Sequence, residues 1–120
     1  MKENYLNIMP KLNIERKISK GETDMRRLPI YKYLDISTAH ITPETDEFLW
    51  KQLGDEYSEL IVYRKIRGYF INVPDLFDLE EMAMPSDLRK CLEFAIKHNC
   101  FWLVLDGDAE VIDELETYEW

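Results

Sequence analysis

The amino-acid sequence predicts an α+β fold with the element order β-α-β-β-α-β. Three observations support this prediction: short apolar runs typical of strands, two stretches with apolar residues at helical spacing, and a tight turn that joins the two middle strands. In this order, two helices cover one face of a four-stranded antiparallel sheet, which is the split-βαβ or ferredoxin-like arrangement. A length of 120 residues suits one such domain.

Composition and capping residues mark the first strand and the first helix. Residues 30–37 (IYKYLDIS) are rich in β-branched and aromatic side chains, which favour strands. Thr42 can then cap the free N–H groups of a helix, and Pro43 suits its first turn. Gly54 is expected to end this helix, because glycine readily adopts the left-handed conformation found after a helix.

A hairpin follows the first helix. Residues 60–66 and 69–73 predict two strands, joined by a tight turn at Arg67-Gly68. Pro74 is expected to end the second strand, because proline has no N–H group to donate to a sheet. The stretch from residue 75 to residue 85 is predicted to be an acidic loop.

The last third of the chain predicts a helix, a buried strand and a tail. Ser86 and Asp87 are predicted to cap the helix, and Asn99 to take the left-handed position after it. Residues 101–105 (FWLVL) predict a strand that is buried on both faces. The tail, residues 106–120, has two aromatic residues near its end and is expected to dock on the domain. The apolar face of the helix comprises Leu88, Cys91, Leu92, Ala95 and Ile96.

Charge divides the chain into two parts. The formal net charge is −9, with 24 acidic and 15 basic residues. Residues 1–29 hold seven basic and four acidic residues, a net charge of +3, whereas residues 30–120 hold eight basic and twenty acidic residues, a net charge of −12. We therefore predict an N-terminal arm or extension over residues 1–28 and an acidic α+β domain over residues 29–120. Such a domain repels nucleic-acid phosphates and attracts basic proteins.

Nothing in the sequence predicts a membrane segment or a cofactor. No apolar stretch approaches the roughly 20 residues that a membrane-spanning helix needs, and the first residues lack the apolar core of a signal peptide. Cys91 and Cys100 lie in or beside apolar runs, and two cysteines do not make a disulfide framework. The sequence predicts a cytoplasmic protein and leaves its oligomeric state open.

RNA binding is one alternative function. Residues 67–71 (RGYFI) resemble the start of the aromatic strand motif of RNA-recognition modules, although the later motif positions are missing. The aromatic residues that would share the helix-free face of the sheet and stack on bases are Tyr31, Tyr33, Tyr63, Phe70 and Trp102. The net charge of −12 opposes this function. Otherwise these aromatic side chains pack under the tail or form a protein interface.

A small metal-binding or ligand-binding enzyme is the other alternative. His40 follows the first strand and, with Asp35 or Ser37, would form an acid–base or nucleophile set. Asp106 and Asp108 follow the last strand, where grouped carboxylates can hold Mg²⁺ or Ca²⁺, but their spacing does not fit an EF-hand. In the structural interpretation, Asp106-Gly107-Asp108 is a turn and His40 is a local hydrogen-bonding residue.

Two acidic stretches are the main candidate for function. One runs from residue 75 to residue 87, and the other is the tail. If they lie together with the acidic turn at residues 44–47, they form a surface that can imitate a nucleic-acid backbone; otherwise they are separate solvated faces. The residues predicted to bind a partner are Asp75, Asp78, Glu80, Glu81, Asp106, Asp108, Glu110, Asp113, Glu114 and Glu116.

Residues 33–120 resemble a family of small bacterial domains of unknown function. The resemblance is carried by residues 33–42 (YLDISTAHIT), 103–108 (LVLDGD) and 115–120 (LETYEW). It implies a bacterial host, a phage or a mobile element, and it implies no activity. Together with the charge, it predicts a non-enzymatic protein that binds a basic, nucleic-acid-handling protein. The sharpest version is an inhibitor of a defence nuclease, of the anti-CRISPR or anti-restriction kind.

Overall fold

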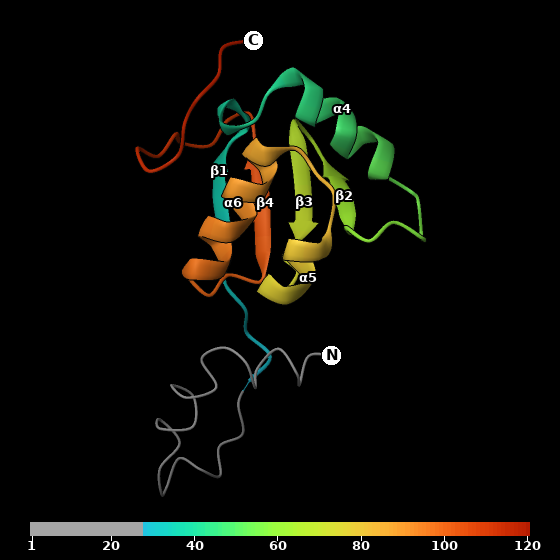
Figure 1. The fold of residues 1–120 in the computed structure, drawn as a ribbon. Helices are drawn as coiled ribbons and strands as arrows, with labels where there is room; N and C mark the ends of the chain where they lie inside the picture. Colours follow the sequence, from blue (N-terminus) through green and yellow to red (C-terminus); the bar gives the residue numbers. More distant parts are fainter. Residues whose placement is uncertain (1–27) are drawn as a thin grey trace, which may run out of the picture. The chain divides into compact units, whose positions relative to one another are not determined.

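The computed structural model describes residues 28–120, and Figure 1 shows their arrangement. Residues 31–120 form one compact unit, which contains every helix and strand described below. The arm predicted over residues 1–28 lies, except for its last residue, outside the described residues. No helix in the described part of the chain is both long and apolar enough to cross a membrane.

The four predicted strands form one sheet. They are β1 (Tyr33–Ser37), β2 (Val62–Lys65), β3 (Gly68–Asn72) and β4 (Trp102–Asp106), in the order β1-β4-β3-β2. β2 pairs antiparallel with β3, and β3 pairs antiparallel with β4, whereas β1 pairs in parallel with β4. The α+β class is therefore confirmed, but the sheet is mixed and does not have the predicted antiparallel ferredoxin-like pairing.

The connection between β3 and β4 explains this difference. After β3 the chain forms α5 (Leu76–Glu81), runs back along the sheet, and returns through α6 (Ser86–Lys97) (Figure 1). The chain therefore reaches β4 at the end of the sheet where β3 stops, and the two strands are antiparallel neighbours. β4 then occupies the place beside β3, and β1 becomes an edge strand.

α5 lies within the stretch that the sequence predicted as an acidic loop. The side chain of Asp75 accepts a hydrogen bond of 2.8 Å from the backbone N–H of Asp78 and caps the helix. The guanidinium of Arg89, on α6, donates to the carbonyl oxygens of Leu79 and Met82 at the other end. A local cap satisfies the first end of the helix, and a tertiary contact from Arg89 satisfies its last end. Apolar periodicity over so short a segment reveals neither contact.

The other two helices follow their predicted signals with one exception. α4 (Pro43–Gln52) is capped by Thr42, whose hydroxyl oxygen accepts from the N–H of Thr45 at 3.2 Å. Asn99 has the left-handed conformation expected after α6, with φ of 61°. The prediction that Ser86 and Asp87 cap α6 is wrong: Pro85 holds the cap position, and no side chain caps the helix. The carboxylate of Asp87 is instead engaged by residues at the start of α4.

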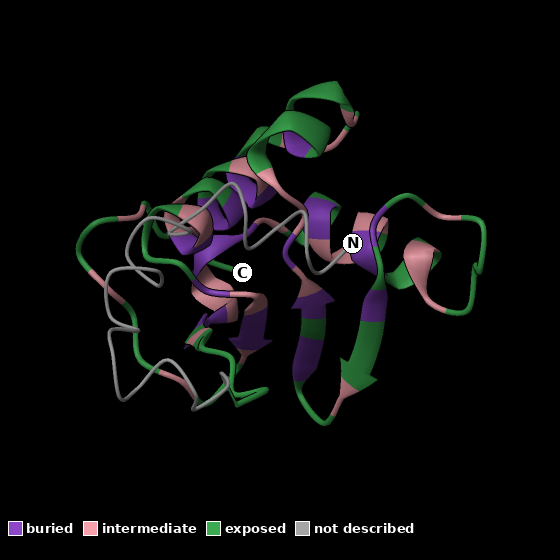
Figure 2. Ribbon diagram, turned by 90° about the horizontal axis from the view of Figure 1, so that it is seen from below, coloured by how far each residue is buried: buried purple, intermediate pink, exposed green. Residues whose placement is uncertain are grey.

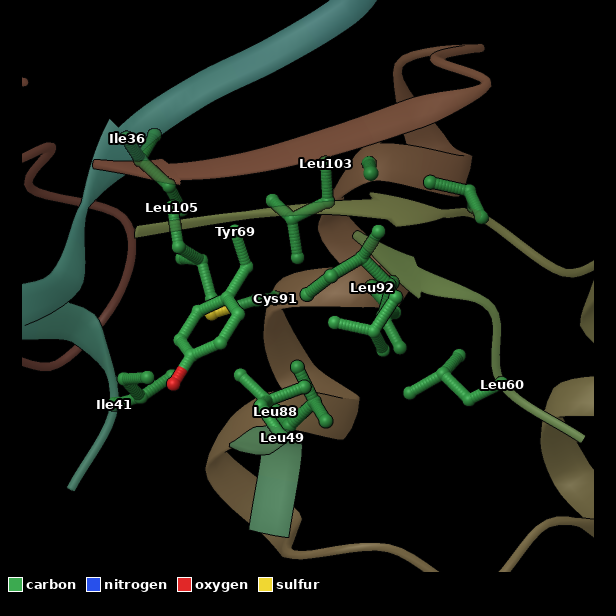
Figure 3. Packing of buried hydrophobic residues seen from close by; sticks show 14 of the residues in the cluster. Ile36, Ile41, Leu49, Leu60, Tyr69, Leu88, Cys91, Leu92, Leu103 and Leu105 are labelled. Atoms are coloured by element: carbon green, nitrogen blue, oxygen red, sulfur yellow. The ribbon is translucent and has the colours of Figure 1, made fainter. Parts of the chain in front are cut away.

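The helices all lie on one side of the sheet, and the core lies between them and the sheet (Figure 2). Figure 3 shows Cys91 and Leu92 of α6 on the side of the cluster that faces Leu103 and Leu105 of β4, and Leu88 of α6 beside Leu49 of α4. These α6 residues belong to the predicted apolar face, and all three are buried. The opposite face of the sheet has no helix in the described part of the chain.

Candidate functional site

The tail is docked on the domain as predicted, and His40 is its main anchor. The imidazole of His40 is only 2% exposed. Its Nε2 accepts a hydrogen bond of 3.0 Å from the backbone N–H of Ile112, so its Nδ1 carries the proton and donates to the carbonyl oxygen of Glu116 at 2.8 Å. Both ring nitrogens of His40 thus hold the tail. His40 is a hydrogen-bonding residue, as in the structural interpretation, but its partners are 72 and 76 residues away along the chain and are not local.

Three further hydrogen bonds fix the course of the tail. The carbonyl oxygen of Glu110 accepts from the N–H of Ser37 at 3.0 Å, and the N–H of Tyr118 donates to the carbonyl oxygen of Ala39 at 2.8 Å. The indole N–H of Trp120 donates to the carbonyl oxygen of Ile41 at 2.9 Å. On the domain side, the residues that make these bonds belong to the short 3₁₀ helix η1 (Thr38–His40) or lie directly beside it. The tail therefore has a defined path although it contains no regular secondary structure beyond β4.

The carboxylates in the middle of the tail face solvent without counter-ions. Glu110, Asp113, Glu114 and Glu116 are all exposed, and within the described part of the chain none of them forms an ion pair. The carboxylate of Glu116 accepts a hydrogen bond of 3.1 Å from the hydroxyl of Tyr118. Burial and this hydrogen bond raise the pKa of Tyr118. The backbone is held in place while the negative charges remain available.

The first two carboxylates of the tail are neutralised locally. Lys65 Nζ lies 2.8 Å from Asp106 Oδ2, and Arg67 Nε lies 3.2 Å from Asp108 Oδ2. The hydrogen bond from Lys65 and the N–H of Asp108 hold the pKa of Asp106 below its usual value. Within the described residues no three or more metal-ligating side chains gather in one place. Of the residues proposed for a metal or acid–base site, His40, Asp106 and Asp108 are instead engaged in contacts that hold the fold, whereas Asp35 is exposed.

The ten carboxylates predicted to bind a partner form two groups. Asp75, Asp78, Glu80 and Glu81 belong to α5 or its cap, which follows the end of β3. β3 and β4 are antiparallel, so the end of β3, at Asn72, lies opposite the start of β4, whereas the tail leaves the far end of β4. Figure 1 shows α5 and the tail at opposite ends of the sheet. The single extended acidic surface does not form.

The helix-free face of the sheet carries the predicted aromatic side chains. Tyr33, Tyr63, Phe70 and Trp102 line an open groove of about 290 Å³, whose remaining lining residue is Val104. Tyr31 does not line this groove; its ring packs 4.6 Å from that of Phe101. The sequence indicated this face correctly, because the alternate residues of all four strands point to it.

A second, polar pocket was not indicated by the sequence. It has a volume of about 300 Å³ and lies among α4, the β2–β3 turn and the tail, with Trp50, Arg64 and Trp120 among its lining residues. The guanidinium of Arg64 lies 4.7 Å from the centre of the Trp50 ring. The hydroxyl of Tyr69 donates to the Asp46 carboxylate at 2.8 Å at the same pocket. These residues are distant in sequence, so only the fold brings them together.

Comparison with known proteins places most of the chain in one family. No curated protein and no solved structure matches the chain. Residues 33–120 match the family described as a family of unknown function (DUF5983), C-terminal domain. The match begins at the first residue of β1 and includes the tail. Since it covers most of the chain, this protein belongs to the DUF5983 C-terminal domain family.

Proposed function

We propose that this protein is a non-enzymatic interaction protein whose tail binds a basic partner protein. The observation that carries the proposal is the arrangement around His40. This side chain fixes the backbone of the tail at Ile112 and Glu116, while the carboxylates between them face solvent without counter-ions.

A held tail binds better than a free one. Ordering a flexible segment costs free energy on binding, and a segment that is already fixed avoids most of that cost. The net charge of −12 over residues 30–120 also attracts a basic surface from a distance and increases the rate of association. The tail therefore combines a prepared shape with a favourable long-range field.

The partner is, in this proposal, a bacterial protein that handles nucleic acid. Such a protein has a basic groove for phosphates, and a row of fixed carboxylates can occupy that groove in place of a nucleic acid. Occupation blocks the groove sterically and electrostatically, as an inhibitor of a defence nuclease would. The free, buried thiols of Cys91 and Cys100 fit a reducing, cytoplasmic setting.

The experiment compares two charge reversals of equal size. The tail variant is Glu110→Lys, Asp113→Lys and Glu114→Lys, three exposed residues whose side chains make no hydrogen bond or ion pair within the described part of the chain. The control variant is Asp78→Lys, Glu80→Lys and Glu81→Lys on α5. Each variant changes the net charge by the same amount, so the two variants differ only in the end of the sheet at which the charge is reversed.

Both variants and the native protein are used to capture proteins from a bacterial lysate. We expect a basic nucleic-acid-binding protein that the native protein and the α5 variant retain and the tail variant loses. The purified partner should then bind the tail variant at least about tenfold more weakly, and binding to the native protein should weaken as salt rises. Equal loss in both variants, or retention by both, would contradict a tail-specific interaction.

A further inference from the structure

The aromatic groove on the helix-free face is assembled from all four strands. Tyr33 comes from β1, Trp102 from β4, Phe70 from β3 and Tyr63 from β2, and Val104 completes the lining. The Tyr63 and Trp102 rings lie 6.1 Å apart. An aromatic ring attracts a cation that lies over its face, and a groove lined by several rings offers more than one such position.

The rings are exposed although they are large and apolar. The exposed fractions are 61% for Tyr33, 56% for Tyr63 and 38% for Phe70. A contiguous apolar patch on a soluble domain marks a binding surface more often than a scattering of single apolar side chains does. Val104, in contrast, is only 3% exposed, so the groove has a closed floor and an open mouth.

Charge at the rim favours a cation as the occupant. Asp35 pairs in register with Val104 and therefore points to the same face of the sheet. Its carboxylate is exposed, and within the described residues it forms no ion pair. The groove thus has aromatic walls, a free carboxylate beside its floor, and the strongly negative field of residues 30–120 around it.

The chain already places one of its own cations against this face. Lys65 Nζ lies 5.9 Å from the centre of the Phe70 ring and 2.8 Å from the Asp106 carboxylate. Its position shows that a cation, an aromatic ring and a carboxylate can be satisfied together on this surface. Asp35, which lies beside Val104 on the edge strand β1, has no such cation within the described residues.

We propose that the aromatic groove binds arginine side chains of a basic protein segment. A guanidinium is planar, stacks on aromatic rings and gives up its weaker hydration more readily than an ammonium does. A nucleic acid also stacks on aromatic rings, but its phosphates are repelled by this domain. The inference deepens the proposed function and rests on it in one respect, namely that the occupant belongs to a basic partner.

The first test measures binding of defined peptides to the full chain. The probe is a flexible twelve-residue Gly/Ser peptide with three arginines, and the matched peptide has citrulline, which keeps the shape of arginine without its charge. With Trp50→Phe and Trp120→Phe, the remaining Trp102 reports occupation of the groove by fluorescence. We expect the arginine peptide to quench Trp102 and the citrulline peptide to bind at least about tenfold more weakly.

Three substitutions test separately how the aromatic rings and the rim charge contribute to binding of the arginine peptide. Tyr63→Leu and Phe70→Leu keep an apolar side chain but remove a ring, and each should weaken binding of the arginine peptide about threefold to tenfold. Asp35→Asn should weaken it by a similar factor through loss of the rim charge. Tyr57→Leu, at a residue that is 87% exposed and does not line the groove, is the control and should bind normally.

The outcomes distinguish this inference from the proposed function. Equal binding of the citrulline peptide, or tighter binding of oligothymidine than of the arginine peptide, overturns the inference. If Tyr63→Leu and Phe70→Leu retain a partner that the tail variant loses, the inference fails and the proposed function stands. If the arginine peptide binds in the groove while tail reversal does not affect partner capture, the groove stands and the proposed role of the tail fails.

Discussion

The hydroxyl of Thr45 donates a hydrogen bond to the carboxylate of Asp87, with the oxygens 2.6 Å and 2.8 Å apart. Both side chains are buried, with exposed fractions of 0% and 8%. The same carboxylate accepts from the backbone N–H of Thr42 at 2.8 Å. One buried acid thus joins the first turns of α4 and α6, and it satisfies an N–H group that would otherwise be left without a partner at the start of α4.

Replacing this acid should destabilise the domain markedly. Asp87→Ala leaves the N–H of Thr42 and the hydroxyl of Thr45 without their acceptor, so we expect a loss of about 2–3 kcal/mol in the free energy of unfolding. Urea denaturation measures the loss. Glu93→Ala, at an exposed residue of the same helix, is the control and should change stability by less than about 0.5 kcal/mol. A similar cost for the two variants would contradict the joining role of Asp87.

His40 should determine whether the tail stays docked. His40→Phe preserves a ring of similar size but removes both hydrogen bonds to the tail, so the amide of Ile112 should lose protection from hydrogen exchange. We expect a stability cost of about 1–3 kcal/mol, because the substitution leaves tail backbone groups without partners. His98→Phe, at an exposed residue, is the control. Unchanged protection at Ile112 would show that other contacts suffice to dock the tail.

The thiol of Cys91 should make the domain less stable in alkali. Burial, with a smaller contribution from the charge of Asp87, raises the pKa of Cys91 to about 12. An unfolded cysteine titrates near pH 8.5, so the folded protein holds the proton more tightly. The contribution of this thiol to the free energy of unfolding is fully present below about pH 8.5. It is lost as the pH rises from there towards the pKa of the folded state.

Denaturation at several pH values tests this expectation. Between pH 8 and pH 10 the free energy of unfolding should fall by about 1–2 kcal/mol through this group. Cys91→Ala should be less stable at neutral pH but should show a shallower alkaline decline. Equal slopes for the native protein and the variant would exclude Cys91 as the cause. Tyr69, whose pKa is also raised by burial, acts in the same direction in both proteins.

Gly68 should tolerate no side chain. A Cβ at this position would lie 1.7 Å from the carbonyl oxygen of Leu105 on the neighbouring strand, so β3 and β4 would have to separate. We expect Gly68→Ala to cost at least about 3 kcal/mol, measured by thermal melting. Gly107→Ala is the matched control, because the nearest atom to its Cβ, at 3.3 Å, belongs to the flexible side chain of Arg67. Equal melting points would mean that the sheet accommodates the methyl group at residue 68.

The sequence predicted well those features that depend on neighbouring residues. The capping of α4 by Thr42, the left-handed Asn99 and the apolar face of α6 all follow from local chemistry, and the structure confirms them. The parallel direction of the pairing between β1 and β4 was not predicted, because it depends on how α5 and its following segment redirect the chain. α5 itself is stabilised by Arg89, a contact that no local pattern shows.

The candidate site was predicted only in part, because a sequence pattern shows which face of a strand a residue occupies but not which distant segments meet. Alternation along the strands was enough to place Tyr33, Tyr63, Phe70 and Trp102 on one face. Alternation does not say at which end of the sheet a loop lies, so the sequence left open whether the carboxylates of α5 and of the tail meet. The role of Asp87 was misassigned, because a residue at a helix start usually serves its own helix, whereas this one serves α4.

The parallel pairing of β1 has a consequence for biosynthesis. Among the strands of residues 28–120, only β4 pairs with β1, and nearly the whole domain separates them along the chain. On the ribosome, residues 33–37 therefore emerge early and wait without a strand partner until residues 102–106 have been made, whereas the hairpin of β2 and β3 can close as soon as it is exposed. Although it emerges before the other three strands of the sheet, β1 is thus among the last to be fixed, and until then Ile36, fully buried in the finished domain, remains open to other contacts.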